Sequence, residues 1–201
     1  YENFNAARAV VEFTGVNVHP GSSKNTMVNA ALVAIEFNSM LPSADTPRDT
    51  EEYEGFFHLD AMNGNVSTAM LDYIIRDHDV ASFDCRLKTM EHIAKILNEK
   101  WGEGTVKLTI TEQYRNMKEI IDTCMELIDC ATAACKECGT PALITPIRGG
   151  TDGARLSFMG VPCPNLGTGG HAFHGPYEHI TVEGMDIAVE VGLKIIELFY
   201  K

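Results

Sequence analysis

The fold is decided by the stretch Phe83-Asp-Cys-Arg-Leu-Lys-Thr-Met-Glu-His-Ile-Ala-Lys-Ile-Leu-Asn-Glu-Lys-Trp101, together with Thr105-Val-Lys-Leu-Thr-Ile-Thr111 just after it. In the first stretch apolar side chains recur at helical spacing, which predicts an amphipathic helix. Gly102 follows its last apolar residue, where glycine commonly ends a helix. The second stretch alternates apolar and polar residues, which predicts a strand with one face in water.

The residues before this helix predict a β-hairpin. Apolar residues alternate from Phe57 to Ala61 and again from Ala69 to Ile75, as they do in strands with one buried face. Asn63-Gly64 lies between the two runs and is a strong turn signal. We therefore expect two antiparallel strands joined by a turn at Asn63-Gly64.

A strand and a helix are predicted before the hairpin. Ala9–Phe13 is short, rich in β-branched residues and alternating, which favours a strand. From Asn25 apolar positions recur at helical spacing, and Leu41-Pro42 ends this helix because proline disfavours the helical conformation of the residue before it. The expected apolar face of the helix consists of Val28, Ala31, Leu32, Ile35 and Ser39.

The element order from residue 8 to residue 112 is therefore β-α-β-β-α-β, the ferredoxin-like arrangement. Right-handed crossovers place both helices on one face of a four-stranded antiparallel sheet. The predicted fold class is α+β in this region and α/β in the region that follows.

After residue 117 the pattern changes to helix, strand, strand, helix. The expected elements are a helix over Ile120–Ala134, strands over Ala142–Thr145 and Val161–Leu166, and a last helix from Thr181. This order, with glycine-rich loops at the strand ends, is typical of part of an α/β layer. Two short strands cannot bury the faces of two helices, so further strands must come from elsewhere.

The composition excludes some classes of function. The formal net charge is −12 and the 16 basic residues are scattered, which argues against nucleic-acid binding because phosphate contacts need clustered Lys and Arg. No apolar run reaches the about 18–20 residues of a membrane span, and no secretory signal is visible. We expect neither a nucleic-acid nor a membrane partner. The chain begins at Tyr1 rather than Met, which fits a piece of a longer protein.

Four of the six cysteines lie between Cys124 and Cys138, on the predicted helix. A disulfide framework distributes its cysteines between loops, so free thiols in a reducing compartment, the cytoplasm, are expected. Cys135-Lys-Glu-Cys138 can also be read as a metal or redox pair, but no second pair accompanies it.

The first candidate site is Gly169-Gly-His171-Ala-Phe-His174-Gly-Pro-Tyr-Glu178. A histidine in a glycine-rich loop can approach a metal ion closely, and Glu178 is spaced to orient an imidazole. An ordinary turn with surface histidines explains the same residues. His171 and His174 cannot by themselves complete a zinc site, which needs three or four ligands.

The second candidate site is Pro146-Ile-Arg148-Gly-Gly-Thr-Asp152-Gly-Ala154. The guanidinium of Arg148 offers a planar fork for a carboxylate, and backbone N–H groups at Gly149 and Gly150 add an anion-binding concavity. The alternative is a loop stabilised by an ion pair between Arg148 and Asp152.

Two further candidates lie in the ferredoxin-like region. His19, in Val18-His-Pro-Gly21 between the first strand and the first helix, is of a type that donates to a developing oxyanion; an ordinary turn is the alternative. Arg76 lies at the end of a strand, where an ion pair with Asp77 or Asp79 is the default expectation.

Taken together and in this order, these stretches resemble the peptidase T family of zinc tripeptide aminopeptidases, in the metallopeptidase superfamily that also contains aminoacylases. The resemblance covers the whole chain. The matching stretches are Glu2–Ala7, Asn17–Gly21, Tyr53–Gly55, Tyr73–Asp77, Pro146–Ala154, Leu156–Gly160 and Pro162–Leu166.

The resemblance implies a catalytic domain with two zinc ions and an inserted ferredoxin-like lid. Residues 8–112 are then the lid, and residues 1–7 and 113–201 are parts of the catalytic domain. His174 is implied as a terminal zinc ligand and His19 as the oxyanion donor. Arg148 is implied to hold the terminal carboxylate of a tripeptide, with Gly149, Gly150 and Asp152 beside it and Arg76 as a weaker substrate-site candidate. His171 has no counterpart.

The family's remaining metal ligands and its general base lie upstream of the position that matches Tyr1, so the resemblance implies that this chain alone is inactive. In the intact enzyme it implies release of the N-terminal residue of tripeptides and a homodimer formed through the lid. The alternatives are a sister amidohydrolase (an acylase, a deacetylase or a dipeptidase) and a stand-alone binding or dimerisation module.

Overall fold

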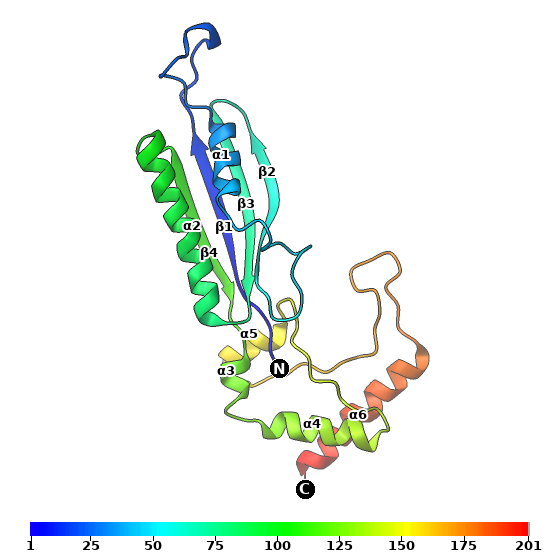
Figure 1. The fold of residues 1–201 in the computed structure, drawn as a ribbon. Coiled ribbons are helices and arrows are strands. Elements are labelled where there is room, and N and C mark those ends of the chain that lie inside the picture. The colour runs from blue at the N-terminus through cyan, green and yellow to red at the C-terminus, as the bar shows by residue number, and fades with distance from the viewer. Residues whose placement is uncertain (201) are drawn as a thin grey trace. The chain divides into compact units, whose positions relative to one another are not determined.

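The structure is a computed structural model that describes residues 1–200 (Figure 1). It divides into two compact units. The sheet unit is Phe4–Arg115, and the helical unit combines Tyr1–Asn3 with Asn116–Lys201. No helix in the part of the chain that the structure describes has the length and apolar content that crossing a membrane requires.

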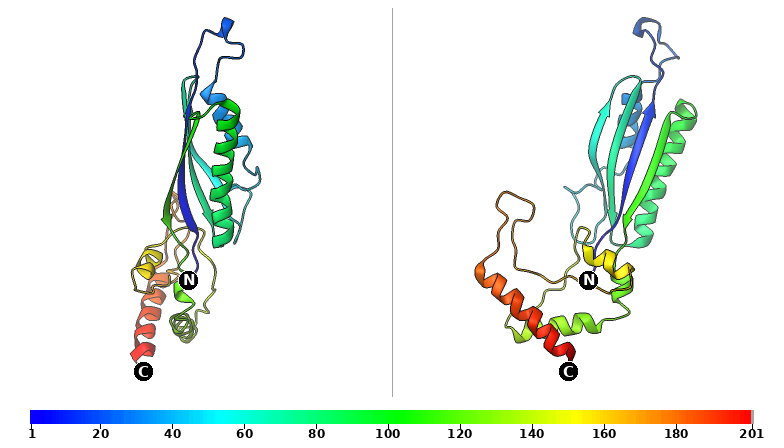
Figure 2. Two further views of the ribbon diagram at one scale, coloured as in Figure 1. Left: turned by 90° about the vertical axis from the view of Figure 1, so that its left-hand side faces the viewer. Right: turned by 180° about the vertical axis from the view of Figure 1, so that it is seen from behind.

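The sheet unit has the predicted ferredoxin-like topology. Its strands are β1 (Asn5–Thr14), β2 (Phe56–Gly64), β3 (Thr68–Asp77) and β4 (Val106–Tyr114), in the spatial order β2-β3-β1-β4 with antiparallel neighbours. Two helices, α1 (Ala30–Ser39) and α2 (Val80–Trp101), cover one face of this sheet (Figure 2). The α+β prediction for this region is confirmed.

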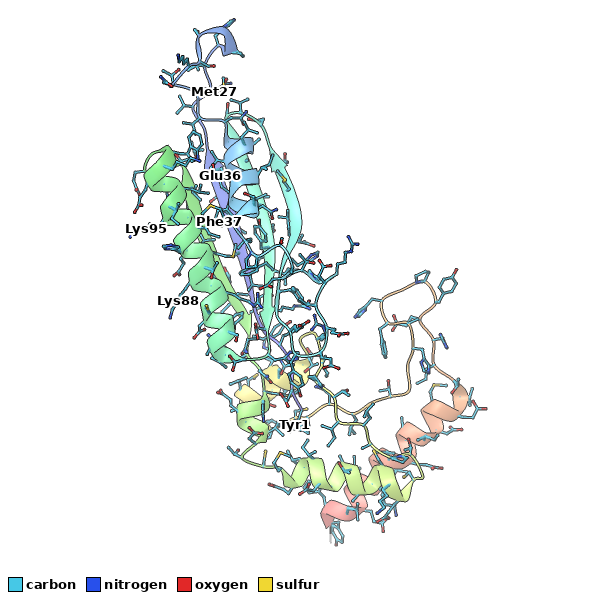
Figure 3. All side chains as sticks on the ribbon, viewed as in Figure 1. Tyr1, Met27, Glu36, Phe37, Lys88 and Lys95 are labelled. Atoms are coloured by element: carbon cyan, nitrogen blue, oxygen red, sulfur yellow. The ribbon has the colours of Figure 1, made fainter. Side chains whose placement is uncertain are left out.

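The core of the sheet unit lies between the sheet and its two helices. On β1 the residues Ala9, Val11 and Phe13 are buried against the helices, whereas Arg8 and Glu12 face the other way and are exposed. Phe37 of α1, labelled in Figure 3, packs edge to face on Phe13, with 5.8 Å between the ring centroids. The alternation read from Ala9–Phe13 is therefore the alternation of a strand with one buried face.

The apolar face predicted for α1 was wrong. The helix begins at Ala30 rather than Asn25, because the side chain of Asn29 caps it by accepting the N–H groups of Ala31 and Leu32. Leu32 and Ile35 are 62% and 53% exposed. Apolar residues occur all round this helix, so spacing alone did not determine its buried face. The buried residues are Ala30, Val33, Ala34 and Phe37.

The hairpin turn predicted at Asn63-Gly64 lies elsewhere. Both residues are part of β2 and pair with Met70 and Ala69 of β3. A Cβ atom at Gly64 would lie 2.6 Å from that of Ala69, so the glycine permits close strand pairing rather than a turn. The turn comes just after it, where Asn65 Oδ1 accepts the N–H groups of Ser67 and Thr68.

The helical unit contains α3 (Lys118–Ile121), α4 (Glu126–Glu137), α5 (Asp152–Phe158) and α6 (Val182–Tyr200). The single helix expected over Ile120–Ala134 is thus divided in two, because residues 122–125 form tight turns, with Thr123 N–H donating to Ile120 O. The last helix is confirmed, and Val191 is its buried residue.

The strands expected at Ala142–Thr145 and Val161–Leu166 are absent from the described residues. A strand needs a neighbour for its backbone hydrogen bonds and an apolar surface for its side chains. In residues 1–200 no neighbouring strand is supplied to these segments, and Leu143 is 85% exposed. Both segments are extended, but they are not part of a sheet.

The two separate pieces of the helical unit are joined by a pair of asparagines. Asn3 N–H donates to Asn116 Oδ1 over 3.1 Å, and Met117 N–H donates to Asn3 Oδ1 over 2.8 Å. Asn3 and Asn116 are both buried. The backbone of Ile147 also bonds to this first segment, through Ile147 N–H to Glu2 O at 2.8 Å.

Candidate functional site

His19 lies in a segment of the sheet unit that projects beyond the end of β1 (Figure 1). The base of the segment is closed by an antiparallel bridge between Val16 and Val28. Gly15 permits this closure, because a Cβ atom there would lie 2.2 Å from Val66 O and 2.4 Å from Val28 O. The segment is therefore held at a defined base, although His19 itself is exposed.

The hydrogen bond made by His19 determines which nitrogen carries its proton. Nδ1 accepts the N–H of Gly21 over 3.1 Å and so caps a short 3-10 helix at Pro20–Ser22. In a neutral imidazole one nitrogen accepts and the other donates. The proton of neutral His19 is therefore on Nε2, which leaves that N–H as a donor.

Arg76 lies near the other end of the same sheet. It pairs in register with Ala6 of β1 and Phe56 of β2, on the face opposite the two helices, and it is half-buried. From Ala6 to Thr14, β1 extends roughly 26 Å at about 3.3 Å per residue. A tripeptide spans about 10 Å. His19 and Arg76 of one chain thus do not meet on the same tripeptide.

The ion pair expected between Arg76 and Asp77 or Asp79 is replaced by a different network. Neighbouring residues of a strand point to opposite faces, and Asp77 bonds to Arg86 of α2, with Nε–Oδ2 at 2.8 Å. Arg86 also reaches Asp45 at 2.5 Å. Asp79 caps α2 by accepting the N–H of Ser82. Nothing in the local sequence around Arg86 indicated this contact.

Burial of the Arg86 guanidinium opposes its charge, but its hydrogen bonds to Asp77 and Asp45 outweigh this and raise the pKa of Arg86 above its ordinary value. The network joins α2, the end of β3 and the loop that contains Asp45. Its role in the sheet unit is structural.

Arg148 lies in the helical unit, immediately after Ile147. Ile147 forms a parallel bridge with Asn3, so the Arg148 segment is fixed to the first residues of the chain. Arg148 and Gly149 are half-buried and Gly150 is exposed. Neither glycine has a positive φ, so the backbone conformation does not require glycine at either position. A Cβ atom at Gly149 would be in ordinary contact with the side chain of Ile147, at 3.8 Å.

Asp152 is in the first turn of α5, a helix that the sequence reading missed. Thr151 caps this helix by accepting the N–H of Ala154, and threonine followed by aspartate is the signal that could have revealed it. Asp152 is exposed, and a carboxylate at this position is stabilised by the helix dipole.

Several residues of the same motif have structural roles. A Cβ atom at Gly153 would lie 2.3 Å from Cys163 O. Ser157 Oγ donates to Gly153 O and accepts the N–H of Cys163, and Asn165 donates to Thr151. These contacts hold α5 against residues 163–165. The motif around Arg148 is therefore also a packing motif.

His174 lies in an exposed loop between residue 167 and α6. Its φ is 63°, and its N–H donates to Glu178 Oε2 over 2.7 Å. Glu178 thus bonds to the backbone of His174, whereas the sequence suggested that it orients an imidazole ring.

A complete metal site is absent from the described residues, in which no group of three or more His, Cys, Asp or Glu side chains is placed to hold an ion. His174 is therefore not part of a cluster of three or more such side chains among residues 1–200. The cysteines are all free, as expected, and Cys135 and Cys138 are not part of a metal cluster.

A groove of about 420 Å³ lies in the helical unit along α4 and α6. Its walls include Ile128, Ala188 and Val191 from the helices and Leu143 and Leu166 from the extended segments. Neither Arg148 nor His174 lines this groove. The lining is mixed, with more apolar than polar surface, and it contains no histidine, aspartate, glutamate or arginine.

Comparison with known proteins supports the resemblance that the sequence motifs indicated. Peptidase T of Clostridium perfringens is 54% identical over 199 residues, which are 99% of this chain and 49% of that protein. The chain thus spans about half the length of the curated relatives it matches. The resemblance to peptidase T is confirmed as a similarity of sequence over the whole chain.

Solved structures show the same fold. A tripeptidase from Staphylococcus aureus superposes with a TM-score of 0.84 at 19% identity, over 98% of this chain and 52% of that one. Aminopeptidase PepT from Bacillus cereus superposes with a TM-score of 0.82 at 17% identity, over 100% and 53%.

A family model described as Peptidase dimerisation domain matches residues 1–105 of the 201. This match includes β1, β2, β3 and both helices of the sheet unit. The chain belongs to the peptidase dimerisation domain family.

Proposed function

We propose that the intact protein is a zinc-dependent tripeptide aminopeptidase, in which the sheet unit is a lid and the helical unit is part of the catalytic domain. The observation that carries this proposal is the 54% identity to a peptidase T over 99% of the chain. That span includes the loops of His19, Arg148 and His174.

The tautomer of His19 supports its role as oxyanion donor. Nδ1 accepts the N–H of Gly21, so Nε2–H is the group that donates to the oxygen of the tetrahedral intermediate. Such a donor strengthens its interaction as negative charge develops in the transition state. Removing one typically costs about 2.7–4 kcal/mol of transition-state stabilisation.

Arg148 is proposed to hold the terminal carboxylate of the tripeptide, with Gly149, Gly150 and Asp152 beside it. Its segment is fixed by the bridge between Ile147 and Asn3, and a fixed guanidinium loses less freedom on binding a carboxylate. Arg76 is kept as a second candidate for a substrate contact, at the end of the sheet away from His19.

His174 is proposed as one zinc ligand, through its imidazole. Two bound zinc ions would supply an activated water and polarise the scissile carbonyl. The other ligands and the general base then come from polypeptide outside these 201 residues. The chain alone is accordingly proposed to be inactive.

The sheet unit is proposed to form a homodimer, as the name of the matched family model suggests. The free cysteines support a reducing compartment such as the cytoplasm. Size-exclusion chromatography with light scattering tests the dimer, and a monomer at micromolar concentration contradicts it.

The role of Arg148 separates a tripeptidase from a sister amidohydrolase. In the intact protein, Arg148→Ala should raise KM for Met-Gly-Gly at least about tenfold, because a charge-assisted bidentate contact is lost. The C-terminal amide of the same peptide should be a poor substrate for both the wild-type protein and the Arg148→Ala variant. An unchanged KM for Met-Gly-Gly would favour a sister activity.

A further inference from the structure

The loop that contains His174 is closed at its neck by two histidines. His171 and His179 form an antiparallel bridge, with N–O distances of 2.9 and 3.1 Å. Their rings stack with 5.3 Å between centroids and 26° between planes. We name residues 171–179 the His174 loop.

Two residues of the His174 loop that are not glycine adopt the left-handed conformation. Ala172 has a φ of 54° and His174 a φ of 63°. This conformation costs a residue with a Cβ atom about 1–2 kcal/mol, so other contacts must hold the chain there. Gly175 N–H donates to Ala172 O, and Glu178 N–H donates to Gly175 O.

The contact that acts on His174 itself comes from Glu178. Its Oε2 accepts the N–H of His174 over 2.7 Å. A carboxylate acceptor makes a shorter and stronger hydrogen bond than a neutral one. Because the bond goes to the backbone, it fixes the direction in which the Cα–Cβ bond of His174 leaves the loop and leaves both ring nitrogens available.

We propose that Glu178 is a positioning residue for metal binding: it holds the backbone of His174 in its left-handed conformation, so that the imidazole is presented to zinc before the ion arrives. This inference rests on the proposed function, in which His174 is a zinc ligand. Outer contacts that orient a metal ligand typically contribute about 10- to 100-fold to metal affinity.

The test uses the intact protein and three substitutions at one position. Glu178→Ala removes the acceptor and should weaken zinc binding, measured by competition with a chromophoric chelator, by about 10- to 100-fold. Glu178→Gln keeps an acceptor oxygen, although a neutral and therefore weaker one, and should weaken zinc binding much less than Glu178→Ala does. Glu178→Asp keeps the charge but is one methylene too short, and should weaken binding as Glu178→Ala does.

The matched control is Glu190→Ala, which removes a carboxylate from an exposed position of α6 and should leave zinc affinity unchanged. Hydrogen exchange at the His174 amide gives a readout that does not depend on catalysis. It should accelerate more in Glu178→Ala and Glu178→Asp than in Glu178→Gln. If Glu178→Ala does not fold, Glu178→Asp decides the question.

The variant His174→Ala separates failure of this inference from failure of the proposed function. If His174→Ala loses zinc while Glu178→Ala and Glu178→Asp bind it like wild type, the positioning role is overturned and the proposed function stands. If His174→Ala keeps its full zinc content, the proposed ligand role is wrong and the positioning role falls with it. Equal loss in Glu178→Gln and Glu178→Ala also overturns the inference, because charge rather than the acceptor would then matter.

Discussion

The sheet unit contains a large hydrophobic core, whereas the hydrophobic core of the helical unit is small. In the sheet unit one cluster joins residues of β1, β2, β3, β4 and both helices, from Ala7 to Val106. In the helical unit the buried cluster contains only Met117, Ile121, Ile128 and Ala154. The same chain thus includes one unit that buries most of its apolar side chains and one in which many apolar side chains are exposed to water.

The exposed apolar residues of the helical unit are concentrated on α6 and on the extended segments. Leu143 and Ile144 are exposed, and no hydrogen bond of the described residues involves the backbone of Ala142–Thr145. On α6 the exposed apolar residues are Val182, Met185, Ile187, Val189, Leu193, Ile196, Phe199 and Tyr200. Unpaired extended backbone can pair with a neighbouring strand, and a sheet formed in this way could cover the exposed apolar side chains. This supports the proposal that further polypeptide completes the unit.

The largest expected effect concerns activity. The 201-residue chain should not hydrolyse Met-Gly-Gly, because its described residues lack a group of side chains that could hold a metal ion. The intact protein should hydrolyse it at a rate that a chelator abolishes. If the 201-residue chain alone released methionine and a chelator abolished that release, the helical unit could not be the incomplete one.

A pair of core substitutions compares the two units directly. Phe37→Ala in α1 should lower the free energy of unfolding of the sheet unit by about 3–5 kcal/mol, as large buried aromatic residues do. Leu143→Ala should change stability by less than about 0.5 kcal/mol in the 201-residue chain, because Leu143 is exposed. Trp101, the single tryptophan, reports the sheet unit in urea titrations.

The effect of Leu143→Ala on stability should differ between the 201-residue chain and the intact protein. If further strands cover this segment, the substitution there should cost about 2–5 kcal/mol. A small cost in both proteins would mean that Leu143 remains exposed in the intact protein, and that the helical unit is not completed at this surface.

A substitution of His19 tests whether the sheet unit only covers the substrate or also stabilises the transition state. In the intact protein, His19→Ala should lower kcat by about 10²–10³-fold with little change in KM, because the contact strengthens in the transition state. Asn17→Ala, in the same exposed segment, is the control. A kcat within a few-fold of wild type would exclude His19 as the oxyanion donor.

The smallest effect is a pH dependence within the sheet unit. The hydrogen bond from Lys100 holds the pKa of Glu36 below its usual range, with a second bond from Trp101 Nε1–H. Because the folded-state pKa is lowered, the stabilisation is present above the ordinary glutamate pKa of about 4.3 and is lost as pH falls through the folded value. Its size should be below about 1 kcal/mol, since the pair is partly exposed.

The variant Glu36→Gln measures this contribution. Urea titrations followed by Trp101 fluorescence at neutral pH and near pH 3 should show a smaller acid destabilisation in the variant than in wild type. An identical loss in both proteins would place the acid-sensitive groups elsewhere in the sheet unit, for instance at Asp72, whose pKa is lowered by its hydrogen bond to Arg8.

Sequence patterns predicted the sheet unit well where one face is clearly apolar. The spacing from Phe83 to Trp101 and the alternation after Thr105 gave α2 and β4, because each buries one face only. The buried face of α1 was not predictable from spacing, because Leu32 and Ile35 are as apolar as the residues it buries.

The helical unit was harder to predict because segments with the composition of a strand find no strand to pair with among the described residues. Ala142–Thr145 has the composition of a strand but no neighbour to pair with. The helix cap at Thr151 is a local signal, so the start of α5 could have been predicted from the sequence. The bond from Glu178 to the backbone of His174 depends on a left-handed loop, and no spacing rule indicates such a conformation at a histidine.

The most direct measurement is a crystal structure of the intact protein with zinc and a non-hydrolysable tripeptide analogue. We expect anomalous zinc density within bonding distance of a His174 ring nitrogen and the analogue's terminal carboxylate on the guanidinium of Arg148. Zinc density remote from His174, or Arg148 on the opposite side of the molecule from the analogue, would contradict it.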